Sequence, residues 1–369
     1  MRKTIGKRES TIAKGSAVAM MLFHHLFLNE QEIITHGGNL TLLFLNQDQL
    51  ITIVQSFKVC VSVFVLISGY GMCLKLRHIN GGGYGPHVTF RFIKLLLNYQ
   101  MIYIIFLLIG LLYPAYNATT VYGSFWNLQS WILLIIDFFG LATAFQTPTL
   151  NATWWYMSVA ILLIAIAPIV YEFGKKFGYR IVVSVSLIGP MLMGLMSTNA
   201  CRYLFAFCIG MSLAESGLID RYKSWKAKSG GPDRYLLILL TFLMIVFLLY
   251  VRQIVVWCDP LAVVAEAVCA VLICVLATEL PSVISTPIFI IGKHSMNIIL
   301  LHTFIFGYYW SQLIYIWNYP ALIFIALLVL SLAFSWAIEK YKTFIRFDRL
   351  VEMVSSRVTA LPLVTEKEG

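Results

Sequence analysis

The sequence predicts an all-α fold, a polytopic membrane helix bundle of about ten transmembrane helices with one further re-entrant or interfacial helix. Three observations predict it. Of the 369 residues, 60% are hydrophobic and only 12% are charged, about half the charged fraction of an average soluble domain. Long apolar segments recur along the whole chain, and the loops between them are short. This pattern excludes a nucleic-acid-binding protein, a secreted disulfide scaffold and a disordered regulator.

A helix needs roughly 17–25 mostly apolar residues to cross the hydrocarbon core. The candidate segments, in chain order, are 12–27, 52–74, 92–113, 126–145, 154–171, 181–196, 202–216, 235–251, 260–278, 288–310 and 320–338. Their connecting loops leave no room for a soluble catalytic domain. Any chemistry must therefore use residues in or beside the membrane.

The 27 lysines and arginines predict the orientation, because cytoplasmic loops carry an excess of positive charge. If residues 126–145 do not cross fully, all of these cations except Lys58, Arg202 and Arg252 fall on the cytoplasmic side. We therefore predict ten spans and two cytoplasmic termini, with 126–145 on the outer side. Asp137 in its middle fits a segment that avoids the bilayer centre. The alternative is that 126–145 is an ordinary span.

Two adjacent histidines, His24 and His25, lie inside the first apolar segment, where a buried ionisable side chain is costly and commonly functional. At about 100° per residue, Lys14 and His25 share one helix face with His25 about 16 Å deeper, whereas His24 points roughly 80–100° away. This arrangement suits a ligand with an anionic head at the cytoplasmic surface and a long arm reaching inward. A neutral His25 would be the proton acceptor. The alternative is a histidine that hydrogen-bonds across the bundle.

A second intramembrane histidine lies late in the chain. Lys293 marks the inner end of its segment, and His302 lies nine residues further on, about 13 Å deeper in a helix. That depth is comparable to the depth of His25, which predicts a shared polar pocket; an isolated packing histidine is the alternative. Glu266 is a further buried acid, and the sequence does not specify its partner.

Polar residues also mark the second and third segments. Ser68 or Tyr70, at the end of the second, could orient a neighbouring imidazole, whereas Gly69 between them suits close helix packing. Arg91 and Lys94 open the third segment at i, i+3 spacing and face one side of a helix start. They could bind phosphates, or they could simply anchor the topology.

Aromatic residues gather at the start of the fifth segment, where Trp155 and Tyr156 follow Trp154. Such residues are typical of an interfacial aromatic belt. They could equally form a platform on which a sugar stacks.

Several motifs occur in a fixed order along the chain. They are Lys14 with His25; Phe64, Ser68, Gly69 and Tyr70; Arg91 with Lys94; Trp155, Tyr156, Met157 and Ser158; Phe207, Gly210 and Met211; and Gly292, Lys293, Ser295, Leu301 and His302. The ordered set resembles acyltransferase family 3, membrane proteins that O-acylate cell-surface carbohydrates. The resemblance covers nearly the whole chain, from about Thr11 to Arg346.

The resemblance implies a ten-helix bundle that uses cytoplasmic acetyl-CoA as its donor substrate and no metal. His25 would carry the acyl-transfer chemistry, and the phosphates of the donor would be held by Lys14, Arg91 and Lys94. Residues that would contact substrate or support His25 are Ser68, Tyr70, Trp155, Tyr156 and His302.

The implied protein is a membrane-bound O-acetyltransferase acting on a hydroxyl of a cell-surface or exopolysaccharide glycan, or of its lipid-linked precursor. It would form one domain over residues 1–350, followed by a cytoplasmic tail over 351–369, in a bacterial plasma membrane. Its partners would be acyl-CoA, the glycan acceptor and membrane lipids, and no nucleic acid. The acceptor, the size of the acyl group and the oligomeric state are not specified by the sequence.

Three positions depart from the family pattern. Lys14 and Lys94 stand where the family commonly has arginine, so bidentate contact with phosphate is lost at both. Ala160 stands where many members have glutamate, which puts an acidic role on the acceptor side in doubt.

Two other classes of function are compatible with a polytopic membrane protein. A transporter of glycans or lipid-linked sugars would be favoured by an inverted repeat, and no such repeat is visible in the sequence. A membrane glycan polymerase or ligase would be favoured by a large outer loop with paired basic residues, whereas the predicted outer loops hold almost none.

Overall fold

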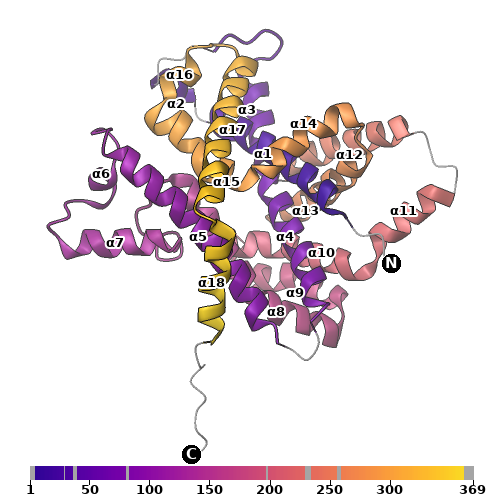
Figure 1. The fold of residues 1–369 in the computed structure, drawn as a ribbon. Helices are drawn as coiled ribbons and strands as arrows, with labels where there is room; N and C mark the ends of the chain where they lie inside the picture. The colour runs from indigo at the N-terminus through magenta and orange to yellow at the C-terminus, as the bar shows by residue number, and fades with distance from the viewer. Residues whose placement is uncertain are drawn as a thin grey trace, which may run out of the picture. The chain divides into compact units, whose positions relative to one another are not determined.

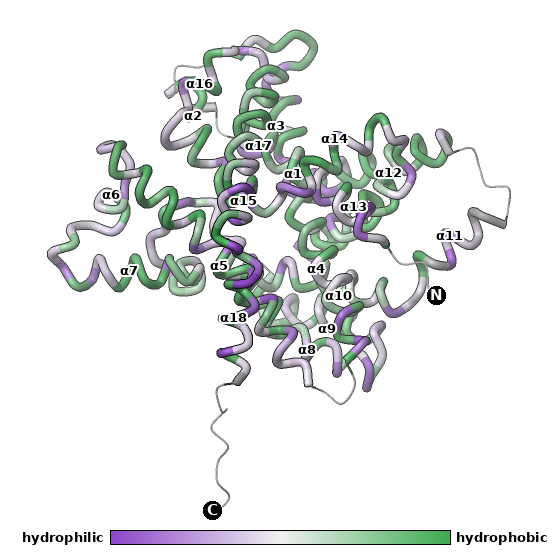
Figure 2. The backbone as a smooth tube through the Cα atoms, in the orientation of Figure 1, coloured by the Kyte–Doolittle hydropathy of each residue, from purple (hydrophilic) through white to green (hydrophobic). Residues whose placement is uncertain are grey.

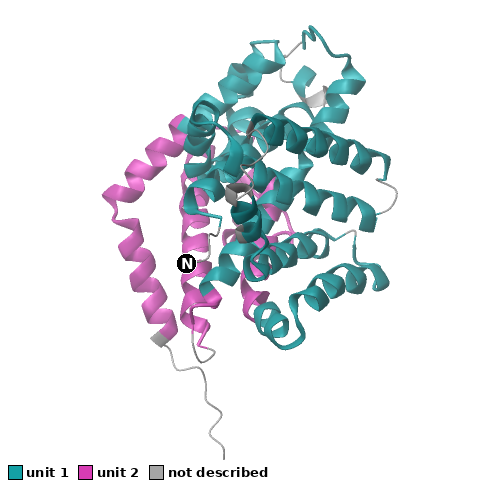
Figure 3. Ribbon diagram, turned by 90° about the vertical axis from the view of Figure 1, so that its right-hand side faces the viewer, with its two compact units in different colours: residues 1–75, 169–332 teal, residues 76–168, 333–369 magenta. Residues whose placement is uncertain are grey.

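The computed structural model describes residues 5–28, 30–35, 40–79, 83–196, 198–228, 234–255 and 259–360 (Figure 1). These residues form helices joined by turns and loops and contain no β-strand, which confirms the predicted all-α fold. The helices group into two compact units (Figure 3). Unit 1 comprises Met1–Lys75 and Ile169–Leu332, and unit 2 comprises Leu76–Pro168 and Ala333–Gly369.

Unit 1 holds most of the helices. In chain order they are α1 (Lys7–Phe27), α2 (Glu30–Thr35), α3 (Gln47–Ser56), η1 (Phe57–Val59), α4 (Cys60–Leu76), α9 (Tyr179–Leu192), α10 (Asn199–Ser216), α11 (Leu218–Lys228), α12 (Arg234–Ile254), α13 (Asp259–Glu279), α14 (Ser282–Lys293), α15 (Ser295–Thr303), the π-helical η3 (Phe304–Tyr309) and α16 (Ser311–Tyr315).

Unit 2 is smaller. It holds α5 (Gly85–Gly110), α6 (Ala118–Tyr122), α7 (Leu128–Phe138), η2 (Ala152–Trp154) and α18 (Phe347–Ala360), while α8 (Trp155–Phe177) and α17 (Pro320–Phe344) contribute residues to both units. The single domain predicted over 1–350 stays a prediction. Of the predicted tail, 351–360 lie in α18, and 361–369 lie outside the described residues.

Helix α1 lies at the centre of unit 1 and contacts α3, η1, α13, α14 and α15. It fits among so many neighbours because Ala13, Gly15 and Ala17 are small and buried, which lets partner backbones come close. Its crossing with α14 is reciprocal. A Cβ added to Gly15 would collide with the backbone oxygen of Ile288, and one added to Gly292 would collide with the backbone oxygen of Thr11.

Replacing Gly292 with alanine should therefore lower the free energy of unfolding by about 1–3 kcal/mol, because the added methyl must push two packed helices apart. Thermal unfolding of the purified protein in detergent measures the effect. Gly189→Ala is the matched control, since a Cβ at Gly189 meets only the end of Met193, at 3.8 Å. Equal unfolding midpoints for the two variants would contradict this crossing.

Two sequence motifs meet at a second glycine crossing, between α4 and α10. A Cβ on Gly69 would collide with the backbone oxygen of Phe207, and a Cβ on Gly210 would collide with that of Leu66. The packing role favoured for Gly69 is thus the one that the structure shows. These glycines set the distance between α4 and α10.

Six described helical stretches are long and apolar enough to cross a membrane, or up to seven if one bent pair counts as a single span. The six are Gln47–Leu76, Gly85–Gly110, Ala152–Phe177, Tyr235–Ile254, Asp259–Glu279 and Pro320–Phe344. The bent pair joins Ser282–Lys293 to Ser295–Tyr309 at 67°. The number is smaller than the ten spans predicted.

The shortfall concerns α1, α9 and α10, which all coincide with predicted spans. Helix α9 has only 14 residues. Helices α1 and α10 are longer but carry Lys14, His24 and His25 in the first and Arg202 in the second, and these polar side chains lower their hydropathy. The residues that make α1 chemically interesting are therefore the same ones that weaken its signature as a span.

Helix α7 covers only 11 residues of the predicted segment 126–145. At 1.5 Å per residue it is about 16 Å long, half the thickness of the hydrocarbon core. This length agrees with the prediction that 126–145 does not cross the membrane fully.

Helix α12 is apolar on most sides, as its colouring in Figure 2 shows. Only 11% of its most apolar window is buried inside the structure, and side chains such as Leu239, Phe242 and Phe247 are about half exposed or more. An apolar surface of this kind is stable against lipid rather than water.

Candidate active site

The structure brings together two histidines that lie far apart in the sequence. The ring of His25 on α1 lies 5.2 Å from the ring of His302 on α15, centroid to centroid, with an angle of 43° between the planes. His302 is fully buried and His25 is half-buried. The comparable depths inferred from Lys14 and Lys293 thus correspond to a real contact within unit 1.

Two backbone carbonyls set the hydrogen-bonding state of His302. Its Nδ1 lies 2.9 Å from the oxygen of Ile298 and 3.0 Å from that of Ile299. Carbonyl oxygens only accept, so Nδ1 carries the proton. In the neutral ring Nε2 is then the acceptor, and the hydroxyl of Thr303 lies 3.5 Å from it.

A break in the helix path positions His302. Helix α14 ends at Lys293, the chain turns by 67°, and α15 begins at Ser295 and packs on α1. The chain then continues into the π-helical stretch η3 directly after Thr303. Departures of this kind from α-helical geometry are frequent at functional sites.

His24 has a different environment from its neighbour. Its Nδ1 lies 2.6 Å from the carbonyl oxygen of Val54 on α3, so it donates to that carbonyl. Its ring stands nearly at right angles to that of His25, with 5.1 Å between the centroids. This bond agrees with the prediction that His24 points away from the helix face that carries His25. Through it, His24 connects α1 to α3.

Toward its N-terminal end, two turns inside the helix, α1 carries Lys14, which is half-buried. Because α1 is one continuous helix, the eleven residues from Lys14 to His25 place them about 16 Å apart along its axis. Near this end the amide of Ile5 donates to the hydroxyl of Tyr70 at 2.9 Å. Tyr70 therefore supports the start of α1, and Ser68 lies half-buried on the same α4.

A cavity of about 220 Å³ also lies near the start of α1. Its walls come from Ile5 and from α10, α11 and α13, and they are almost entirely apolar; they include Leu213, Val271 and Cys274. Such a lining suits an apolar group and not a phosphate.

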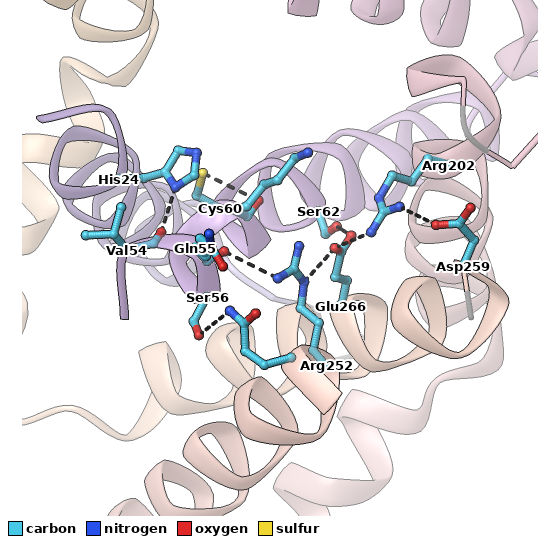
Figure 4. Close-up of polar contacts among 12 residues, drawn as sticks. His24, Val54, Gln55, Ser56, Cys60, Ser62, Arg202, Arg252, Asp259 and Glu266 are labelled. Carbon is cyan, nitrogen blue, oxygen red and sulfur yellow. Dashed lines mark hydrogen bonds and ion pairs between the residues drawn. The ribbon is translucent and has the colours of Figure 1, made fainter. Parts of the chain in front are cut away.

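One group of charged residues was not predicted as a site. We call it the Glu266 cluster, and it comprises Lys58, Arg202, Arg252, Asp259 and Glu266. Figure 4 labels the two arginines and the two acids. Oε1 of Glu266 accepts from Arg202 at 2.8 Å and from Arg252 at 2.7 Å, and Arg202 also bonds Asp259 at 3.2 Å. Its three cations are those that the predicted topology does not place on the cytoplasmic side. That exception is the one feature of the sequence that could have pointed to this cluster.

Unit 2 holds the remaining predicted residues. On α5, Arg91 is half-buried and Lys94 is exposed, and Lys94 pairs with Asp348 of α18 at 3.0 Å. At the start of α8, the rings of Trp155 and Tyr156 lie 6.1 Å apart at right angles. All four side chains retain some exposure.

A buried carboxylate anchors α7 within unit 2. Asp137 is 1% exposed and accepts from the hydroxyl of Tyr122 at 2.5 Å, the amide of Leu150 at 2.7 Å, and the hydroxyls of Thr149 and Tyr99 at 2.9 and 3.2 Å. Burial, and then the neighbouring Asp137 carboxylate, raise the pKa of Tyr122. Tyr122 therefore keeps its proton and donates it.

Replacing Asp137 with alanine should lower the free energy of unfolding by at least about 2 kcal/mol, since each buried donor left unpaired costs about 1–3 kcal/mol. Denaturation in detergent measures the loss. Asp348→Ala is the control, because its side chain is 81% exposed and an exposed ion pair contributes about 1 kcal/mol or less. A loss no greater than the control's would contradict the anchoring role of Asp137.

Comparison with known families decides the class of this protein. The family model described as an acyltransferase domain, that of acyltransferase family 3, matches residues 9–340. This chain belongs to acyltransferase family 3. Comparison with curated proteins and with solved structures gave no match.

The family match runs from the first turn of α1 into the last turns of α17. It therefore includes every residue predicted for the site, from Lys14 to His302. Membership of family 3 and the apolar helices together make this a multi-pass membrane acyltransferase. Within unit 1, the contact of His25 with His302 brings together two imidazoles, side chains of a type that can transfer protons.

Proposed function

We propose that this family 3 acyltransferase moves an acetyl group from cytoplasmic acetyl-CoA to a hydroxyl of a cell-surface or exopolysaccharide glycan, or of its lipid-linked precursor. The observation that carries the proposal is the contact between His25 and His302. In the proposed reaction His25 is the general base, and it lies on the same helix as Lys14.

In the proposed reaction, His25 removes the proton from the acceptor hydroxyl while the hydroxyl oxygen attacks the carbonyl carbon of the thioester. The carbon–sulfur bond then breaks, and the proton passes from His25 to the departing sulfur. The products are an acetyl ester and free CoA. A route through an acetyl-histidine on His25 has the same products and forms the ester in a second step.

The environment of His302 supports this role for His25. Its Nδ1 proton is already donated to the carbonyls of Ile298 and Ile299. The neutral ring therefore offers Nε2 as an acceptor, and an acceptor beside His25 favours the imidazolium that forms when His25 takes a proton. His302 is accordingly proposed as the residue that positions and supports the base.

The family resemblance extends the proposal to the donor and the acceptor. Lys14, Arg91 and Lys94 would bind the phosphates of CoA through their positive charge. The exposed pair of Lys94 with Asp348 is weak enough to be exchanged for a phosphate contact. Trp155 and Tyr156 would stack on the sugar of the acceptor.

The protein is proposed to lie in a bacterial plasma membrane with both termini in the cytoplasm, as the gathering of cations indicates. A fluorescent protein that matures only in the cytoplasm, fused after residue 369, tests this orientation. Fluorescence of the fusion is expected, and activity of a periplasmic reporter at the same position would contradict it.

The decisive experiment uses the purified full-length protein in lipid nanodiscs with radiolabelled acetyl-CoA and a crude glycan acceptor from a bacterial envelope. The expected result is release of CoA together with label that mild base removes from the glycan as acetate. Transport of glycan across vesicles without CoA release would instead identify a transporter and overturn the proposal.

A further inference from the structure

We infer that the Glu266 cluster binds an oxyanion of the acceptor glycan, a carboxylate or a phosphate, next to the base. The inference deepens the proposed acetyl transfer and rests on it for the identity of the acceptor. It assigns a specificity role to residues outside the family motifs found in the sequence.

The charges of the Glu266 cluster do not balance. Within the described residues, the carboxylate of Glu266 is 2% exposed and faces two guanidinium groups through one oxygen. Lys58 interacts electrostatically with Glu266 and also with both arginines. Asp259 contributes a second acid, which pairs with Arg202, but its side chain is 45% exposed. Among the more buried members, two arginines therefore face one acid, and this excess of positive charge is costly without an anion.

The hydrogen bonding of the cluster is incomplete within the described residues. The Nε of Arg202 is buried and has no hydrogen-bond partner among the described residues, although buried guanidinium donors are normally satisfied. The other oxygen of Glu266, Oε2, accepts a hydrogen bond from the hydroxyl of Ser62 at 3.4 Å, which is long. Arginine donors at fixed angles favour carboxylates and phosphates as acceptors.

Helix α3 links the cluster to the neighbour of His25. Val54 accepts the hydrogen bond from His24, and the carbonyl of the next residue, Gln55, accepts from Nη1 of Arg252 at 3.3 Å. Figure 4 shows Arg252 and Glu266 between His24 and Arg202. One short piece of α3 thus joins the cluster to the residue beside His25. An acceptor held here by its acidic group would carry its hydroxyls toward the base.

The three cations of the cluster differ from the other cations of the chain in their predicted side of the membrane. Lysines and arginines on the cytoplasmic side orient a membrane protein, but Lys58, Arg202 and Arg252 are the three that this rule does not place there. The orientation of the protein in the membrane does not explain why these three cations lie near one acid. In the proposed orientation these three cations lie toward the outer side of the membrane, from which a cell-surface glycan approaches. Acidic glycans carry carboxylates or phosphates.

The competing explanation is that the cluster only holds its helices together. A substitution of Lys58 distinguishes this structural role from anion binding. Lys58 is exposed, on η1, so Lys58→Gln removes charge with little effect on packing. Lys175→Gln is the matched control, an exposed lysine in an i, i+3 pair with Glu172. Binding is read from the thermal unfolding midpoint of the full-length protein titrated at constant ionic strength. The probes are a glucuronate-containing tetrasaccharide, inorganic diphosphate and neutral chitotetraose.

The expected result is that one of the two oxyanions raises the midpoint, that Lys58→Gln weakens its affinity at least fivefold, and that Lys175→Gln and chitotetraose show no such effects. The active probe distinguishes a carboxylate from a phosphate. Equal affinities in the wild type and Lys58→Gln would overturn the inference. The inference would also be overturned if neither oxyanion binds. Complete displacement of the bound oxyanion by phosphatidylglycerol nanodiscs would overturn it as well.

The same preparations are assayed for CoA release, so the two proposals can fail separately. Lys58-dependent oxyanion binding in a protein that releases no CoA would remove the acetyltransferase proposal and keep the anion site. Acetyl transfer with oxyanion affinity unchanged in Lys58→Gln would remove the anion site and keep the acetyltransferase.

Discussion

Replacement of His25 by alanine is expected to lower the rate of acetyl transfer by about 10²–10⁴-fold, the usual contribution of a positioned general base. The variant should remain folded, because His25 is only half-buried and its contacts with His24 and His302 are ring contacts at 5.1 and 5.2 Å. CoA release and glycan-bound acetate measure the rate. Near-ultraviolet circular dichroism verifies the fold.

His24→Ala is the matched control, since it removes a neighbouring imidazole from the same helix. Its loss breaks the bond to Val54 and should cost stability rather than chemistry, with a rate within about tenfold of the wild type. His302→Phe should keep the ring volume and lower the rate at saturating substrates. A folded His25→Ala protein that transfers acetyl at the normal rate would disprove the assignment.

Replacement of Glu266 by alanine is expected to lower the free energy of unfolding by about 3–5 kcal/mol, because it removes the buried acid that both guanidinium groups share and leaves Arg202 only the partly exposed Asp259. Arg202 and Arg252 both bond to the same oxygen of Glu266, and the side chain of Arg252 is only 8% exposed. The two cations would then face each other across the vacated position. Urea denaturation in mild detergent measures the loss.

A triple replacement tests the cause. Changing Glu266, Arg202 and Arg252 together to leucine or methionine removes the charges as well as their partner, and should recover most of the lost stability. Glu172→Ala serves as the control, since the pair of Glu172 with Lys175 is about half exposed and contributes little. If the triple variant is less stable than Glu266→Ala, uncompensated charge is not the cause.

Much of the fold could be predicted because helix formation and membrane solubility depend on local composition. Each of the ten segments expected to cross coincides with a helix, and the segment expected not to cross fully contains the short α7. The predicted number of spans exceeds the number of described helices long and apolar enough to cross a membrane. Part of this difference arises where Lys14, His25 or Arg202 interrupts an apolar run. Such residues are stabilised by partners elsewhere in the chain, which a count along the sequence cannot see.

Much less of the candidate site could be predicted. Helical periodicity placed Lys14 and His25 on one face and turned His24 away, because these relations lie within a single helix. It did not show that the hydroxyl of Tyr70 accepts a hydrogen bond from the amide of Ile5, just before α1. Nor did it provide a partner for Glu266, since its arginines come from two other helices.

The sequence by itself determined that this protein is an all-α membrane acyltransferase of family 3 and that its first helix carries a lysine and a histidine on one stripe. Periodicity, charge and motif order are properties of neighbouring residues, so they can be read along the chain. Only the tertiary structure decided that His25 meets His302 and that Lys58, Arg202 and Arg252 gather around Glu266. Those contacts join segments up to 277 residues apart, and close packing at glycines such as Gly15 and Gly292 sets which segments meet.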